Sequence, residues 1–215
     1  MRKITTILFD LDGTLIDTNE LIISSFLHTL NHFYPGDYDR ESVLPFMGPP
    51  LQESFGKLNP EKCDDMCAHY REHNRANHDD LVTEFEGVTE TIETLHEQGY
   101  KLAIVSTKSR MMVIRGLELM GLKPYFDVII SLDEVEHPKP HPEPVQKALE
   151  ALGSAPEEAL MVGDNHHDIL GGRNAGVLSA GVAWSAKGKA HLEQYEPDFM
   201  LDTMQDILTI VGAEG

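Results

Sequence analysis

Apolar residues recur along the chain with two different spacings, and these spacings predict two kinds of structure. In residues 18–33 the apolar positions follow a helical period, residues 61–79 have the pattern of a polar helix, and no run between residues 18 and 80 has the pattern of a strand. Beyond Gly87, short apolar runs alternate with helix-like segments. The predicted strands are residues 4–10, 101–106, 126–131, 159–164 and 178–184, with a weak strand-helix pair within residues 198–211.

Strands that alternate with helices of this length predict an α/β protein with a parallel sheet, because parallel neighbours need a crossover between them. The all-helical stretch interrupts this alternation directly after the first strand. We therefore predict a Rossmann-like parallel-sheet core formed by residues 1–16 and 82–215. Residues 17–81 are predicted to form an inserted helical domain.

Composition narrows the choice of partners and compartment. The net charge of −19 results from 36 acidic and 17 basic residues, and such a chain is poorly suited to bind nucleic acid or an anionic membrane. No apolar run approaches the roughly 20 residues needed to span a bilayer. The only cysteines, Cys63 and Cys67, lack the additional ligands of a zinc site, which favours reduced thiols. These features predict a cytoplasmic protein.

Chemically active side chains follow four of the predicted strands where each strand ends. They are Asp10 and Asp12 after the first, Ser106, Thr107 and Lys108 after the second, Lys139 in the loop after the third, and Asp164 and Asp168 after the fourth. Ligands of open parallel sheets bind beyond the carboxyl ends of the strands, so we expect these groups to converge. Carboxylates gathered in a cleft repel one another unless a cation lies among them. Hard oxygen ligands of this kind suit Mg²⁺, completed by water and a substrate phosphate.

Four motifs carry a resemblance to a known family. They are FDLDGTLID at residues 9–17, VSTK at 105–108, HPKPHPEP at 137–144 and VGDNHHDI at 162–169. In order and spacing they resemble the motifs of the haloacid dehalogenase (HAD) superfamily, and the resemblance extends over the whole chain, including a helical cap inserted after the first motif. The chain is most similar to the phosphoglycolate phosphatase branch and, within it, to the bacterial HAD-type inorganic pyrophosphatases.

This resemblance implies a hydrolase that uses Mg²⁺ and splits pyrophosphate through an aspartyl-phosphate. Asp10 would be the nucleophile, and Asp12 would protonate the leaving oxygen and then take a proton from water. Ser106 would hydrogen-bond the transferred phosphoryl group. Lys139 would offset its negative charge.

The resemblance also implies the metal ligands and the substrate contacts. Mg²⁺ would be held by Asp10, Asp164 and the backbone carbonyl of Asp12, and Asp168 would be either a ligand through water or a partner of Lys139. The loop that contains Gly48 either approaches the substrate or is an ordinary connection between helices. The predicted substrate contacts are Gly48, Ser106, Thr107, Lys108 and Lys139.

Two alternative functions remain open from the sequence. A phosphatase of a small monoester such as phosphoglycolate would use the same residues. A receiver-like module that binds phosphate without turnover would share the acidic pocket, but it has no use for an acid/base group at Asp12. The adjacent His166 and His167 could indicate a transition-metal site, although exposed loop histidines explain them more simply.

Overall fold

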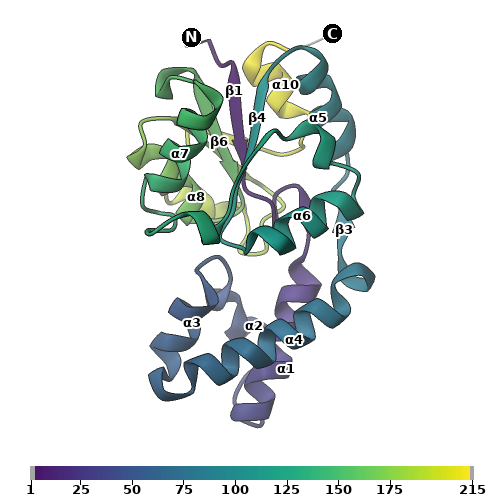
Figure 1. Cartoon of the computed structure of the whole chain (residues 1–215), viewed down its shortest axis with the longest axis vertical. Helices are drawn as coiled ribbons and strands as arrows, with labels where there is room; N and C mark the ends of the chain where they lie inside the picture. Colours follow the sequence, from purple (N-terminus) through teal and green to yellow (C-terminus); the bar gives the residue numbers. More distant parts are fainter. Residues whose placement is uncertain (1–2, 214–215) are drawn as a thin grey trace. The chain divides into compact units, whose positions relative to one another are not determined.

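The computed structural model describes residues 3–213 and divides the chain into two compact units (Figure 1). The first unit contains the residues up to Ile16 together with those from Glu84 onward. The second unit is the inserted segment Asp17–Thr83. Among the described residues, no helix is both long and apolar enough to cross a membrane.

The first unit is built on a six-stranded sheet in the order β5-β4-β1-β6-β7-β8. Every neighbouring pair is parallel, which confirms the predicted α/β fold. The strands are β1 (Thr6–Phe9), β4 (Lys101–Val105), β5 (Val128–Ile130), β6 (Ala159–Gly163), β7 (Leu178–Val182) and β8 (Phe199–Leu201). Because β1 lies between β4 and β6, its carboxyl end is at the centre of the sheet edge.

Helices cover both faces of this sheet (Figure 1). They are α5 (Val88–Glu97), α6 (Arg110–Leu119), α7 (Glu143–Leu152), α8 (His166–Asn174), α9 (Lys189–Glu193) and α10 (Asp206–Val211). On one face, Leu8 of β1 lies in a buried cluster with Val145 and Leu149 of α7. Burial on both faces explains why the first strand is a continuous apolar run instead of an alternating one.

The second unit is helical apart from the ends of two short strands. Its helices are α1 (Asn19–Phe33), α2 (Arg40–Val43), α3 (Leu51–Leu58) and α4 (Cys63–Leu81), and the strands β2 (Ile16–Asp17) and β3 (Thr83–Glu84) form a separate two-stranded sheet. The ring of Phe26 on α1 packs 5.5 Å from that of Phe55 on α3 and 4.8 Å from that of Tyr70 on α4. This aromatic cluster gives the unit a core of its own.

Candidate active site

Three neighbouring strands of the first unit each deliver a polar residue at their carboxyl ends. Asp10 follows β1, Ser106 follows β4 and Asp164 follows β6. The backbone N–H of Asp10 donates to the carbonyl of Val162 at 2.9 Å, and that of Ser106 donates to the carbonyl of Ile130 at 2.9 Å. The ladder hydrogen bonds thus continue past the strands and fix the backbone from which both side chains project.

Lys139 is the central cation of the site. Its Nζ donates to Asp10 Oδ1 at 2.8 Å and to the carbonyl of Val105 at 2.5 Å, and it lies 2.6 Å from Asp168 Oδ1. The residue is only 3% exposed. Burial lowers the pKa of Lys139, but the charges of Asp10 and Asp168 raise it above its ordinary value. The ammonium group is therefore charged, and its three partners hold it between two carboxylates.

Three carboxylates gather around this ammonium. Oxygens of Asp10, Asp164 and Asp168 all lie within 4.8 Å of one another. Burial, opposed by the charge of Lys139 and assisted by that of Asp168, raises the pKa of Asp10 to about 7. Burial, followed by the charges of Asp10 and Asp168, raises the pKa of Asp164 well above its usual range. Both shifts have the sign expected when one ammonium does not compensate several crowded carboxylates.

Asp168 is held from two sides at the start of α8. Its Oδ2 accepts from the backbone N–H of Asn165 at 3.0 Å, and its Oδ1 pairs with Lys139. The side chain of Asn165 in turn accepts from the backbone N–H of His167, and Asn165 and Asp168 form a capping box at this end of the helix. A Cβ atom at Gly163 would overlap the carboxyl of Asp168, so the small residue at the end of β6 makes room for it.

Asp12 has a different environment from Asp10, although it is only two residues away. Its Oδ1 accepts from Lys108 Nζ at 2.6 Å, and the two side chains are 16% and 17% exposed. Directly after Asp12 the chain turns at Gly13, whose φ is +78°. A Cβ atom at Gly13 would overlap the carboxyl of Asp164, so this glycine is needed for both the turn and the close approach.

The remaining predicted site residues are Thr107, Lys108 and Gly48, and they differ in how they are connected to the charged side chains described above. Thr107 is half-buried between Ser106 and Lys108 in the loop between β4 and α6. Lys108 also donates its backbone N–H to Ser106 Oγ at 3.2 Å, which ties this loop to the site. Gly48 belongs to the second unit, where it has a φ of +108°, and its contact with substrate stays a prediction.

Arg110 is another cation that follows the second motif, but it is held elsewhere. Its Nη1 donates to Glu134 Oε1 at 2.6 Å and to the carbonyl of Ile129 at 2.9 Å. The sequence places Arg110 and Lys108 only two residues apart, yet only Lys108 contacts a carboxylate of the site.

Sequence reasoning missed two residues that follow β7. Ser185 Oγ donates to the backbone carbonyl of Asp164 at 2.7 Å. Lys187 is half-buried, and its positive charge counteracts the raised pKa of Asp164. Both lie beyond the carboxyl end of a parallel strand, so the argument applied to the first four strands would have found them at the fifth.

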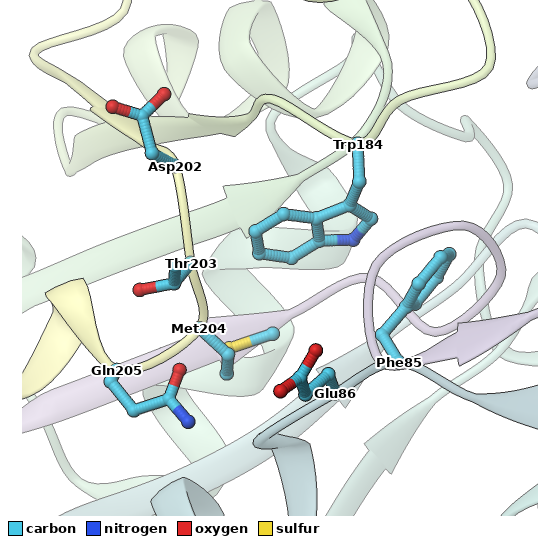
Figure 2. Close-up of a pocket in the computed structure, with 7 residues that line it drawn as sticks. All are labelled: Phe85, Glu86, Trp184, Asp202, Thr203, Met204 and Gln205. Carbon is cyan, nitrogen blue, oxygen red and sulfur yellow. The ribbon is translucent and has the colours of Figure 1, made fainter.

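A separate pocket of about 280 Å³ lies in the first unit (Figure 2). Trp184 lies on one side of it, where its Nε1 donates to the carbonyl of Thr14 at 3.3 Å and its ring is 5.8 Å from that of Phe85. None of the lining residues is a predicted site residue. They are Phe85, Glu86, Trp184, Asp202, Thr203, Met204 and Gln205.

The parallel sheet and its acidic edge agree with what comparison with known families finds. The family described as haloacid dehalogenase-like hydrolase matches residues 7–182. The chain belongs to this family, and it is therefore a hydrolase. The matched span begins in β1 and ends with β7, and it contains every predicted site residue. The resemblance drawn from the four motifs is confirmed.

More particular relatives match over nearly the whole chain. Pyrophosphatase PpaX of Bacillus cereus is 60% identical over 210 residues, which cover 98% of this chain and 97% of that protein. Pyrophosphatase PpaX of Anoxybacillus flavithermus is also 60% identical over 210 residues, with 98% of both chains covered. The solved structure of a haloacid dehalogenase-like family hydrolase from Streptococcus pneumoniae has a TM-score of 0.86 at 29% identity, and it covers 98% of this chain and 99% of that one.

Proposed function

We propose that this protein is a Mg²⁺-dependent inorganic pyrophosphatase that works through an aspartyl-phosphate. Pyrophosphate is proposed as the substrate because the chain is 60% identical to the pyrophosphatases PpaX over 98% of its length. The chemistry is supported by the contacts of Lys139, which joins Asp10 and Asp168 in a buried site.

Asp10 is the proposed nucleophile. Its carboxylate attacks one phosphorus, an Asp10–phosphorus bond forms, and the bond from that phosphorus to the bridging oxygen breaks. Asp12 gives a proton to the leaving phosphate. In the second step water attacks the phosphoryl group, gives its proton to Asp12 and releases Asp10. The partial exposure of Asp12 supports this role, because both the leaving group and water must reach it.

The residues present fit a Mg²⁺ ion. Asp10 and Asp164 supply hard carboxylate oxygens, and the raised pKa of both groups has the sign expected of a site that needs more positive charge. The backbone carbonyl of Asp12 is the proposed third protein ligand. The bound ion would offset the charge of the transferred phosphoryl group. Asp168 has one oxygen on Lys139 and the other on a backbone N–H, so we propose that it positions Lys139 and reaches the ion only through water.

Ser106 and Lys139 are the proposed binders of the transferred group. Ser106 Oγ accepts from the backbone N–H of Lys108, so its own hydrogen can be donated to a phosphoryl oxygen. Lys139 presents a fixed charge that needs no rearrangement during the reaction.

Lys108 and Thr107 are the proposed contacts of the leaving phosphate. The Lys108 ammonium already lies against Asp12, the proposed proton donor to that group. A phosphate that leaves from pyrophosphate carries more negative charge than the alcohol that leaves from a monoester, so a cation at this place favours pyrophosphate.

We also propose that residues 1–16 and 82–215 are the catalytic core and that residues 17–81 are a cap that selects the substrate, with Gly48 as a contact. The division of the chain into two compact units, with boundaries in the sequence after Ile16 and after Thr83, supports this proposal. A cytoplasmic location is supported by the free thiols of Cys63 and Cys67.

The test measures phosphate release with Mg²⁺ from pyrophosphate, phosphoglycolate, a hexose phosphate and p-nitrophenyl phosphate. We expect the highest kcat/KM for pyrophosphate, and a transient mass increase of one phosphoryl group on Asp10. Asp10→Asn should abolish turnover while circular dichroism shows a folded chain. A preference for phosphoglycolate would overturn the substrate but keep the chemistry. Turnover by Asp10→Asn at the wild-type rate would refute the covalent mechanism, and no release from any substrate would favour a binding module.

A further inference from the structure

Four histidines of the helical unit form a continuous stack, here named the histidine column. His28 and His32 are one turn apart on α1, and His69 and His73 are one turn apart on α4. The rings alternate between the helices: His73 stacks on His28 at 4.4 Å between centroids, His28 on His69 at 4.7 Å, and His69 on His32 at 4.6 Å. All four belong to one compact unit, and the column takes no part in the proposed hydrolysis.

Hydroxyl groups of α1 hold the inner nitrogens of the two α4 histidines. Ser25 Oγ donates its only hydrogen to the carbonyl of Leu21 at 2.6 Å, so it must accept from His73 Nδ1 at 3.1 Å. The neutral ring of His73 therefore carries its hydrogen on Nδ1 and a lone pair on Nε2. His69 Nδ1 lies 3.4 Å from Thr29 Oγ1, the hydroxyl one turn further along α1. Outer partners of this kind fix the tautomer and the orientation of metal-binding histidines.

Exposure and charge around the column also favour a cation. His28 and His32 are exposed and His69 and His73 are half-buried, so an ion can reach the column from solvent. Burial lowers the pKa of His69, the neighbouring imidazoles lower it further, and the carboxylate of Glu72 opposes the shift. Histidines kept neutral near pH 7 present lone pairs for coordination.

We propose that the histidine column is a binding site for a transition-metal ion of the Zn²⁺ and Ni²⁺ class. Two histidines one helical turn apart can chelate such an ion, and here two such pairs face each other across α1 and α4. No three side chains of the column bring their ring nitrogens within 4.8 Å of one another, so binding requires the exposed His28 and His32 to turn about their side-chain bonds. Neutral imidazole does not suit Mg²⁺, which separates this site from the acidic one. A bound ion would join the two longest helices of the unit.

The test is a calorimetric titration of the full, untagged chain with Ni²⁺ slightly above neutral pH. An excess of Mg²⁺ keeps the carboxylates around Asp10 from taking up Ni²⁺. The variant pair His28→Gln/His32→Gln removes the α1 half of the column, and both residues are exposed, so the fold should persist. The matched control is His96→Gln/His137→Gln, which removes two exposed histidines outside the column.

We expect the wild type and the control to bind one Ni²⁺ per chain with equal affinity, and Ni²⁺ to raise the Tm of both. The column variant should bind at least about tenfold more weakly and show no Ni²⁺-dependent change in Tm. Equal affinities for all three proteins would show that Ni²⁺ binds elsewhere and would overturn the proposal. The absence of wild-type binding, or an equal loss in the control, would overturn it as well.

Discussion

Replacing Gly13 by Ala should have two separable effects: a loss of unfolding free energy from the strained backbone and a loss of Mg²⁺ affinity at the proposed metal site. Gly13 has a φ of +78°, and its backbone N–H donates to the carbonyl of Ile16 at 2.8 Å. The added Cβ atom would overlap the terminal carboxyl atoms of Asp164, the proposed Mg²⁺ ligand. Because the overlap involves the end of a side chain, Asp164 can rotate away while the backbone keeps its path.

The size of each cost follows from this geometry. An alanine in the left-handed region loses about 1–2 kcal/mol of unfolding free energy relative to glycine. Gly99 provides the matched control, because its φ is +80° and nothing lies within 4 Å of a Cβ atom built on it. Gly13→Ala and Gly99→Ala should therefore be destabilised by similar amounts. Only Gly13→Ala should also lose Mg²⁺ affinity, by at least about tenfold, or about 1.4 kcal/mol.

Two measurements test this prediction. Urea unfolding without Mg²⁺ gives the stability of each variant, and the Mg²⁺ dependence of phosphate release gives its metal affinity. Wild-type Mg²⁺ affinity in Gly13→Ala would refute the reasoning, because the carboxyl displaced by the new methyl group could then not be a ligand. A much greater destabilisation in Gly13→Ala than in Gly99→Ala would refute the step in which Asp164 rotates freely.

Three further predictions concern proton transfer, leaving-group binding and pH. Asp12→Asn should lower kcat/KM more for phosphoglycolate, a poor leaving group, than for p-nitrophenyl phosphate; equal losses would remove the acid role. Lys108→Met should reduce kcat/KM for pyrophosphate by at least about tenfold and kcat/KM for p-nitrophenyl phosphate by less. Arg110→Met loses the contacts with Glu134 and Ile129 and should change neither value. Equal losses in the two variants would contradict the assignment of Lys108 to the leaving phosphate. Burial and neighbouring imidazoles lower the pKa of His69 and His73 from 6.5, so below pH 6.5 these two residues bind more protons in the unfolded chain than in the folded one. Their contribution to the free energy of unfolding should then be fully present above pH 6.5 and be lost as the pH falls, so in pH-series urea titrations the wild type should lose more stability on acidification than His69→Gln/His73→Gln; an equal pH dependence of the two proteins would disprove this cause.

The sequence was sufficient to predict the backbone frame of the site. The runs that end at Asp10, Ser106 and Asp164 are continuous and apolar because both faces of the sheet are covered, and such runs are easily recognised. Once the strands are parallel, their carboxyl ends must share one edge, and the three residues come together without further information. Local pattern and topology therefore determine which residues meet.

Side-chain partners depended on tertiary contacts that no local pattern encodes. Lys108 and Arg110 look equivalent in the sequence, but one pairs with Asp12, 96 residues away, and the other pairs with Glu134. The histidine column is a second case. Its two one-turn spacings are visible in the sequence, whereas their alignment depends on how α1 packs on α4. Burial of the kind that changes the pKa of Asp10 is likewise a property of the folded unit.

The charges at the sheet edge explain how a chain with a net charge of −19 can take a polyanion as substrate. Four carboxylates and three ammonium groups meet there: Asp10, Asp12, Asp164 and Asp168 with Lys108, Lys139 and Lys187. With all of them ionised and no ion bound, the sum is one negative charge, and pyrophosphate would be repelled. A divalent cation changes that sum to one positive charge, and the cation also lies where the phosphoryl oxygens must approach. For the proposed reaction, the site therefore attracts pyrophosphate only after the metal ion has bound. Pyrophosphate should bind weakly when Mg²⁺ is withheld.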